Sequence, residues 1–412
     1  MRILKLSPYY EPEQIASTHL TCDLQKACVE AGFTIENHVP MPTRGVSDAV
    51  RREYKHRKYE ETDGGSVIVH RFPMFREGRN PLGRAVRYVL VNMVQYFRGC
   101  RAKDADLILA GSTPPTQGLM CGLVKKRLKI PFVYNLQDIF PDSLVSAGMT
   151  KKGSLIWKLG RRIEDFTYRS ADRIVVISED FKQNILRKGV PEEKIVVIPN
   201  WVDTERVYPV PRRDNALFDR YHLDREGFYV CYSGNIGHSQ NLHLLLEAAR
   251  ALADELPRLR FVLIGEGAAR RELEETLRAE GIGNVILMPF QAYEEIAQVF
   301  SLGDVGLIIS KPGVGGSSVP SKTWSIMAAG RPVLASFDRG SALERTLETC
   351  GCGVLAEAGD VQALKEAVLR LARDREAAEE MGRRGRKYVL ENLTRRIGTQ
   401  KWIDTLRRAK ES

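Results

Sequence analysis

The sequence predicts an α/β protein of two Rossmann-like domains that face each other across a cleft. Its 412 residues are enough for two hydrophobic cores of ordinary size. Short apolar runs alternate with helical periodicity along the chain, which is typical of parallel sheets with crossover helices. Pro209, Pro211, Arg212 and Arg213 interrupt this pattern, and a second set of strands begins near Phe228.

The apolar runs define the expected strands, and spacing of three or four residues defines the expected helices. The expected strands are 1–6, 66–71, 107–110, 132–136, 173–177 and 196–198, followed by 229–233, 260–264, 285–287, 305–309 and 332–336. The expected helices include 80–101, 155–168, 241–252, 323–329 and 379–410. We therefore expect an N-terminal domain at 1–208, a linker at 209–222, a C-terminal domain at 223–385 and a C-terminal helical segment at 386–412 that packs back on the N-terminal domain.

Composition excludes several classes of protein. No apolar run approaches the roughly 18 residues of a membrane-spanning helix, and the first residues do not form a secretory signal. Seven cysteines in a chain of this size argue against a disulfide framework and favour the reducing cytoplasm. Cys350 and Cys352 lack the spacing of a zinc knuckle, so we expect no metal site.

Positive charge is concentrated in the first half of the chain. The net charge is +10, and residues 1–200 hold 32 basic against 22 acidic residues. Within the expected helix 80–101, apolar side chains form one stripe with arginines along its flank. The stripe consists of Leu82, Val86, Val89, Leu90, Met93 and Phe97, and the arginines are Arg84, Arg87, Arg98 and Arg101. This pattern favours contact with an anionic membrane surface over nucleic acid, but it also fits an ordinary core stripe with solvated arginines.

Three glycine-containing loops follow strands of the second half, at the edge where parallel sheets bind ligands. Glycines let backbone N–H groups approach an anion closely, and Arg270 could lie over a nucleobase. Each loop alone could be a plain connection, but together they favour a nucleoside diphosphate. The candidate residues are Ser233, Gly234, Asn235, Gly237, Gly265, Glu266, Gly267, Arg270, Gly315, Gly316, Ser317, Ser318, Val319, Pro320, Ser321 and Lys322.

Polar loops of the first half are candidates for binding a second substrate. The loop after the first strand carries Tyr10, Glu13 and Gln14, and the strand 132–136 leads into Gln137 and Asp138. A carboxylate at Asp138 could bind a substrate hydroxyl or stabilise a positively charged transition state, although capping the next segment is an equally simple role. We take Asp138 and Lys322 as the candidate catalytic residues.

Seven segments of the chain together resemble retaining nucleotide-sugar glycosyltransferases of family 4, which have the GT-B fold. The Pro-Ser-Lys form of the lysine segment resembles the WbuB-like branch of surface-polysaccharide glycosyltransferases. The matching segments are 8–13, 171–178, 198–203, 232–237, 265–267, 319–322 and 328–333.

The resemblance implies an activity and its partners. The C-terminal domain would bind a nucleoside diphosphate sugar, with UDP as the carrier and an N-acetylated amino or deoxy sugar as one possibility. The N-terminal domain would bind a hydroxyl acceptor, such as a glycan on polyprenyl diphosphate. Transfer would retain the anomeric configuration without a metal, and the protein would be cytoplasmic and peripheral at the inner face of the cell membrane.

Several positions depart from the family pattern. Asn235 and Gln240 stand where many members have Arg and Lys, and Gln137 replaces a histidine. Ser317 and Ser325 replace two glutamates, of which the second binds ribose, so Ser325 joins the candidate donor residues. These departures keep two rivals open, a nucleotide-sugar epimerase of the same fold and a catalytically decayed, membrane-docked scaffold. A dinucleotide-dependent dehydrogenase is a poor alternative, because no third glycine completes the fingerprint.

Overall fold

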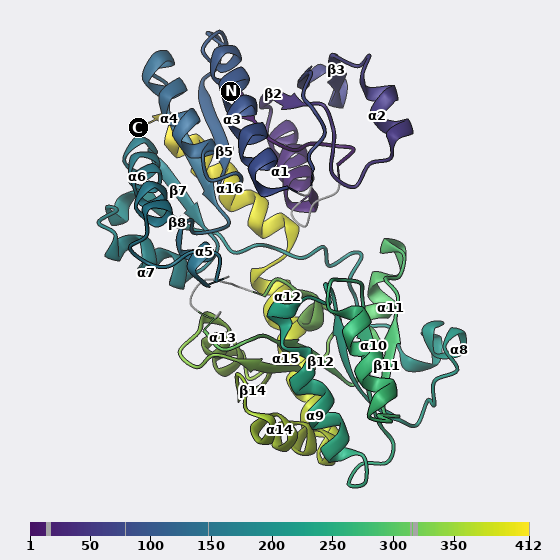
Figure 1. Cartoon of the computed structure of the whole chain (residues 1–412). Coiled ribbons are helices and arrows are strands. Elements are labelled where there is room, and N and C mark those ends of the chain that lie inside the picture. Colours follow the sequence, from purple (N-terminus) through teal and green to yellow (C-terminus); the bar gives the residue numbers. More distant parts are fainter. Residues whose placement is uncertain (14–17, 79, 147, 314, 316–319, 412) are drawn as a thin grey trace. The chain divides into compact units, whose positions relative to one another are not determined.

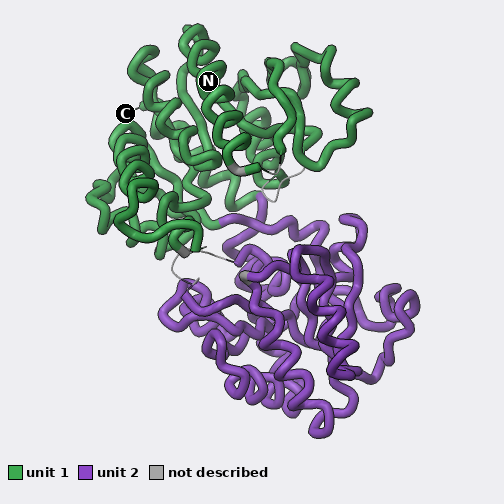
Figure 2. The backbone as a smooth tube through the Cα atoms, in the orientation of Figure 1, with its two compact units in different colours: residues 1–199, 396–412 green, residues 200–395 purple. Residues whose placement is uncertain are grey.

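The computed structural model describes residues 1–13, 18–78, 80–146, 148–313, 315 and 320–411. The chain divides into two compact units, residues 1–199 with 396–412 (unit 1) and residues 200–395 (unit 2) (Figure 2). Each unit has its own sheet covered by helices, which confirms the predicted α/β class with two Rossmann-like parts. The boundaries expected at 209, 223 and 386 stay predictions about independently folding domains.

Unit 1 contains an eight-stranded sheet in the order β3-β4-β2-β1-β5-β6-β7-β8, in which only the β3–β4 pair is antiparallel among the described strands. Its strands are β1 (Arg2–Leu6), β2 (Thr34–Pro40), β3 (Tyr59–Thr62), β4 (Val67–Phe72), β5 (Leu107–Gly111), β6 (Phe132–Leu136), β7 (Arg173–Val176) and β8 (Ile195–Val197). Its helices are α1 (Thr18–Glu30), α2 (Asp48–Tyr54), α3 (Pro81–Gly99), α4 (Gln117–Leu128), α5 (Asp142–Ser146), α6 (Leu155–Ser170), α7 (Glu179–Arg187) and α16 (Arg395–Glu411).

Unit 2 contains a six-stranded parallel sheet in the order β11-β10-β9-β12-β13-β14. Its strands are β9 (Phe228–Ser233), β10 (Leu259–Ile264), β11 (Val285–Met288), β12 (Val305–Ile309), β13 (Val333–Phe337) and β14 (Gly353–Glu357). Its helices are α8 (Leu217–Arg220), α9 (Leu242–Leu252), α10 (Arg270–Ala279), α11 (Ile296–Ser301), α12 (Lys322–Ala328), α13 (Ala342–Cys350), α14 (Val361–Arg373) and α15 (Arg375–Asn392). Short 3-10 turns lie at Asp63–Gly65, Glu192–Lys194, Arg212–Asp214, His238–Gln240 and Tyr293–Glu295.

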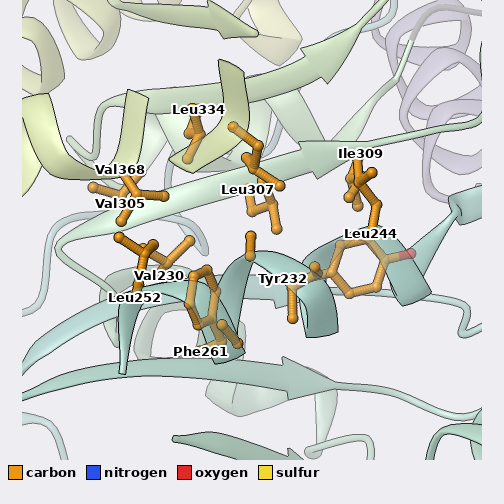
Figure 3. Packing of buried hydrophobic residues seen from close by; sticks show 14 of the residues in the cluster. Val230, Tyr232, Leu244, Leu252, Phe261, Val305, Leu307, Ile309, Leu334 and Val368 are labelled. Atoms are coloured by element: carbon orange, nitrogen blue, oxygen red, sulfur yellow. The ribbon is translucent and has the colours of Figure 1, made fainter. Parts of the chain in front are cut away.

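The largest core cluster of unit 2 lies between its sheet and the helices α9 and α14. Side chains of β9, β10 and β12 such as Val230, Phe261 and Leu307 meet Leu252 of α9 and Val368 of α14 (Figure 3). All of these side chains are buried. The packing holds neighbouring strands in register, so the ends of β9 and β10 lie side by side.

The C-terminal region differs from the expected single helix at 379–410. α15 ends at Asn392 and α16 begins at Arg395, with Val202 bridging to Thr394 between them. α15 belongs to unit 2, whereas most of α16 belongs to unit 1. In Figure 1, α16 is the yellow helix that runs along unit 1. Lys410 Nζ lies 3.1 Å from Asp106 Oδ1, and the C-terminal helix therefore packs back on the N-terminal fold as predicted.

No described helix combines the length and the apolar composition that crossing a bilayer requires.

Candidate functional site

Two glycine loops of unit 2 pack backbone against backbone at the carboxyl ends of β9 and β10. The Gly234 N–H donates to the Ile264 carbonyl at 2.9 Å. A Cβ on Gly265 would lie 1.9 Å from the Gly234 carbonyl oxygen, and one on Gly267 would lie 2.2 Å from the Ile236 carbonyl oxygen. Glycine is therefore required sterically at these positions, and the two predicted donor loops form one surface.

Lys322 reaches this surface from the start of α12. Its Nζ donates to the Tyr232 hydroxyl at 2.7 Å, and that hydroxyl donates to the Asn235 carbonyl at 2.6 Å. A Cβ on Gly234 would lie 2.6 Å from Lys322 Nζ, so the absence of a side chain there makes room for the ammonium. The structure thus brings Lys322 and the two loops together, with Tyr232 as a positioning residue that the sequence analysis missed.

The ammonium of Lys322 has no carboxylate partner among the described residues. Desolvation by the surrounding protein lowers the pKa of Lys322 to about 8. A positive charge removed from water and left unpaired is costly, and a bound anion would compensate it. The ammonium also lies over the Tyr232 ring, 3.9 Å from its centroid, which leaves its solvent side open to a bound anion.

The loop from Lys311 to Ser321 differs in part from the expected nest of amides. Asp338, which follows β13, accepts hydrogen bonds from the N–H groups of Gly313 at 2.9 Å and Gly315 at 2.6 Å. The Gly315 amide, predicted to face a phosphate, is therefore already bonded to a carboxylate. Pro320 and Ser321 open α12, with their carbonyls accepting from Thr323 and Trp324. Gly316, Ser317, Ser318 and Val319 lie outside the described residues.

Other predicted donor residues hold the shape of the loops. The Arg270 guanidinium donates to the carbonyls of Gly265 and Met288, and its Nε lies 3.0 Å from Glu274 Oε1. Arg270 therefore joins the ends of β10 and β11. Ser233 ends β9, and Asn235 and Glu266 are exposed in the loops that follow β9 and β10. The Gly237 N–H donates to Gln240 Oε1 at 3.1 Å. Ser325 lies within α12.

Asp138 lies in unit 1, just beyond the carboxyl end of β6. The hydroxyl oxygen of Ser112, which follows β5, accepts from the N–H groups of Gln137 at 3.0 Å and Asp138 at 3.1 Å. The Asp138 carboxylate accepts from Ser143 at 3.3 Å and keeps access to solvent. Protein atoms exclude part of its hydration, and this desolvation raises the pKa of Asp138. Asp138 is thus held by its backbone while its carboxylate stays available.

A partly buried ion network supports the segment after Asp138. Lys188 Nζ lies 2.7 Å from Asp142 Oδ2 and 2.8 Å from Glu164 Oε1. The Tyr168 hydroxyl also donates to Glu164 at 2.7 Å. Asp142, the second carboxylate of the loop, therefore anchors α5 to α6 and α7.

The loop after β1 is held largely by its own side chains. The buried Glu13 carboxylate accepts from the N–H groups of Thr43 at 2.6 Å and Arg44 at 2.9 Å. The Tyr10 hydroxyl donates to Gln25 at 2.9 Å, and burial raises the pKa of Tyr10 to about 12. Gln14 lies outside the described residues. Glu13 thus has a structural role where an acceptor contact was predicted. Gln137, the other predicted acceptor residue, lies after β6 and donates to the Asn135 side chain at 2.8 Å.

The apolar stripe of α3 faces solvent, so the alternative of an ordinary core stripe is wrong for these residues. Its six side chains are between 39% and 76% exposed. Arg101 is exposed, Arg84 pairs with Glu77 at 2.9 Å, and Arg98 lies over the Phe72 ring. Arg87 corrects the prediction, because it is fully buried and donates to the Phe75 carbonyl at 3.2 Å, and it therefore cannot meet a membrane.

One cluster of potential metal ligands occurs within the described part of the chain, formed by Glu36, His38 and His70. The two rings stack with centroids 4.7 Å apart and planes 13° apart, so their in-plane lone pairs run side by side rather than toward one ion. Glu36 also accepts from Arg2, and hydrogen bonds from both histidines lower the pKa of Glu36. The arrangement fits a hydrogen-bonded cluster better than a metal centre.

A cavity of about 580 Å³ lies at the other end of α12, away from Lys322. Two arginines in its lining are bonded to backbone carbonyls, Arg331 to Ser301 at 2.8 Å and Arg386 to Ala328. Arg331 thereby holds the segment between α12 and β13 against α11, and Arg386 holds the end of α12 against α15. The cavity is therefore not part of the candidate donor surface.

Comparison with known proteins places both halves in one group. Residues 20–201 match the family model of the glycosyl transferase 4-like domain, and residues 214–388 match that of glycosyl transferases group 1. A Pseudomonas aeruginosa protein named as a glycosyltransferase, WbjE, is 30% identical over 65% of this chain and 66% of its own length. A protein of Escherichia coli (strain K12) named for colanic acid biosynthesis, WcaI, is 30% identical over 56% of this chain and 58% of its own. The matches thus span about two thirds or less of these relatives.

Solved structures share the fold at low identity. Sucrose-phosphate synthase from Thermosynechococcus elongatus has a TM-score of 0.76 at 17% identity, covering 99% of this chain and 98% of its own. Anabaena HepE in complex with UDP has a TM-score of 0.72 at 16% identity, covering 98% and 99%. Both family models describe glycosyltransferases, and together they span most of the sequence. The chain therefore belongs to the glycosyltransferases of the GT-B fold.

Proposed function

We propose that this protein transfers a sugar from a nucleoside diphosphate, with UDP as the carrier, to a hydroxyl group of a lipid-linked glycan. The observation that carries the proposal is the partly buried ammonium of Lys322 beside the glycine loops of unit 2, which has no carboxylate partner among the described residues. A diphosphate there would restore the charge balance. UDP in the HepE complex supports the choice of nucleotide.

In the proposed reaction, the bond between the anomeric carbon and the diphosphate oxygen breaks, and the acceptor oxygen bonds to the same face of that carbon. The acceptor proton passes to the leaving diphosphate, so the configuration is retained. Lys322 stabilises the charge that develops on the leaving group, and Asp138 orients the acceptor. No step requires a metal ion.

Two observations support a membrane-borne acceptor. The exposed apolar stripe of α3 with Arg101 at its end suits the boundary between headgroups and acyl chains. The colanic acid name of WcaI is consistent with polysaccharide assembly in the cell envelope. We therefore propose that the protein is peripheral at the inner face of the membrane. For the transferred sugar we propose an N-acetylated amino or deoxy sugar.

Calorimetric titration with UDP tests the donor half of the proposal. We expect saturable binding by the parent and a loss of roughly 30-fold or more in affinity for Lys322→Ala, because a charge-assisted hydrogen bond is removed. Lys365→Ala is the matched control, since this lysine lies on α14 of the same unit and pairs with Glu255. Equal affinity in all three proteins would overturn the assignment.

Transfer itself is measured with a panel of UDP-sugars and a polyprenyl-diphosphate glycan. Proton NMR of the product reports the anomeric configuration, and assays in EDTA report whether a metal is needed. Release of UDP that depends on the acceptor supports a transferase, whereas isomerisation of the donor without acceptor would indicate an epimerase. UDP binding without either reaction would indicate a decayed scaffold.

A further inference from the structure

A second exposed apolar cluster lies outside both halves of the site, at the start of α6. Leu155, Ile156 and Leu159 are 85%, 59% and 60% exposed, and Met149 in the preceding loop is 70% exposed. The three side chains of α6 occupy the first turns of a capped helix, because the Ser154 hydroxyl accepts from the Trp157 N–H at 3.2 Å. The cluster is therefore presented by regular structure.

Positive charges without ion pairs in the described structure lie close to this cluster along the chain. Four exposed cations lie within the same stretch, and none forms an ion pair with any residue that the structure describes. By contrast, Arg161 on the other side of the helix pairs with Glu164 and with Asp165 at 2.7 Å. The unpaired cations are Lys151, Lys152, Lys158 and Arg162. Exposed apolar side chains with exposed cations next to them in the sequence match a surface of anionic phospholipid, with acyl chains beneath negative headgroups.

The cluster adjoins the predicted acceptor edge of unit 1. Gly160, the next residue along α6, packs so closely on the Asp138 loop that a Cβ there would lie 2.8 Å from both Phe140 and Pro141. The three connections β4–β5, β5–β6 and β6–β7 contain α3, α4 and α6, and all three cross the sheet in the same direction. Right-handed crossovers therefore place these helices on the same face of the sheet. α4 contacts both α3 and α6 (Figure 1).

We infer that the segment from Met149 to Arg162, with Met149, Leu155, Ile156 and Leu159 as its apolar side chains, inserts into the interface of an anionic bilayer as a second anchor on the helical layer that also contains α3. Two anchors on one helical layer would fix the rotation of unit 1 on the membrane, which one helix alone leaves free. The benefit of this second anchor for catalysis rests on the proposed function, because the anchor would hold the Asp138 loop beside the headgroup of a lipid-linked acceptor.

Trp157 supplies a built-in probe of insertion. It is partly exposed within the anchor, whereas Trp201, Trp324 and Trp402 are buried. With vesicles of equal phosphatidylglycerol and phosphatidylcholine, we expect a blue shift of tryptophan emission and quenching by lipids brominated along the acyl chain. Trp157→Phe should abolish both signals while vesicle binding through α3 continues. Vesicle binding of the parent without quenching of Trp157 would overturn the inference.

The combined variant Leu155→Ser, Ile156→Ser, Leu159→Ser tests the energetic contribution of the cluster. We expect its partition onto these vesicles to fall by about 30-fold or more, since three apolar side chains no longer leave water. Leu390→Ser is the control, because this leucine of α15 is 43% exposed in unit 2. If the triple variant instead removes concentration-dependent self-association and leaves vesicle binding unchanged, the surface binds a second copy and the inference is wrong.

Titration with UDP and transfer to a water-soluble acceptor keep the two proposals separate. The triple variant should retain both of these properties. If the parent lacks them but Trp157 is quenched, the proposed function fails and the anchor stands. If the parent has them and Trp157 is not quenched, the anchor alone fails.

Discussion

Replacing Lys322 with methionine should stabilise the protein while abolishing donor binding. Methionine has a similar length and no charge, so it can occupy the space beside Gly234 without a desolvated ammonium. The Tyr232 hydroxyl keeps its hydrogen bond to the Asn235 carbonyl, so the replacement leaves that group partnered. The variant loses the contact of the ammonium with the Tyr232 ring, whose centroid lies 3.9 Å from Nζ, and removal of the desolvated charge is the larger of these two opposing effects.

The magnitude follows from the pKa of Lys322, which burial lowers from its ordinary value of 10.5 to about 8. Each pKa unit corresponds to about 1.4 kcal/mol, which gives about 3 kcal/mol as an upper bound on the cost of keeping this group protonated at neutral pH. Partial contact with solvent reduces this cost, and we expect Lys322→Met to gain about 1–2 kcal/mol in free energy of unfolding at pH 7.

The gain should depend on pH in a defined direction. Below pH 8 the lysine is protonated in both the folded and the unfolded state, so the parent bears the full cost. Between pH 8 and 10.5 the folded state binds fewer protons than the unfolded state, so the stability of the parent rises with pH and the difference from Lys322→Met closes.

Urea unfolding at several pH values, with and without UDP, measures both consequences. UDP at 100 times its dissociation constant should stabilise the parent by about 2.7 kcal/mol and leave the variant unchanged. A variant less stable than the parent at pH 7, or one stabilised equally by UDP, would refute the reasoning that Lys322 is an unpaired cation held for an anion.

Three other substitutions test the geometry. Gly265→Ala should lower the free energy of unfolding by about 2–4 kcal/mol in urea titrations and remove UDP binding, because of the clash with Gly234; Gly283→Ala, with nothing within 4 Å of its Cβ position, should change neither. Asp138→Asn should lower kcat by about 100-fold with an unchanged melting temperature. In the parent, kcat should fall with decreasing pH, because the Asp138 carboxylate, whose pKa is raised, becomes protonated. Asp338→Asn leaves one of two amides without an acceptor and should raise the donor KM about tenfold while kcat changes less in steady-state assays; unchanged kinetics would assign no role to the Asp338 contact.

Apolar patterning predicted most of the fold, because the central strands are buried on both faces. Expected strands such as 132–136 and 305–309 coincide with β6 and β12. Strand β2 was missed because Glu36, Asn37 and His38 interrupt its apolar pattern, although all three are buried. Their burial depends on neighbours from β1 and β4, which are distant in the sequence. Strand β3 is polar and β14 is a partly exposed edge strand, and both were missed as well.

The donor surface was predictable in its loops but not in its partners. Glycines after strands mark close approaches of backbone, and the structure brings Gly234 and Gly265 together as expected. The contacts of Asp338 with the Gly315 loop and of Tyr232 with Lys322 join residues that are far apart in the sequence. Arg87 failed for a related reason, since a helical wheel does not show that the chain around Phe75 covers one flank of α3.

Asn235 and Gln240, which stand where many family members carry charge, instead fix the shape of the first glycine loop. The Gln240 side chain accepts from the Gly237 N–H at 3.1 Å, and the Asn235 carbonyl accepts from Tyr232. The positive charge is concentrated on Lys322, where neighbouring protein replaces water and an ion pair is stronger than at an exposed position. Under the proposed function, one partly desolvated ammonium beside the glycine loop would perform the task of exposed cations, at the cost in stability that Lys322→Met would reveal.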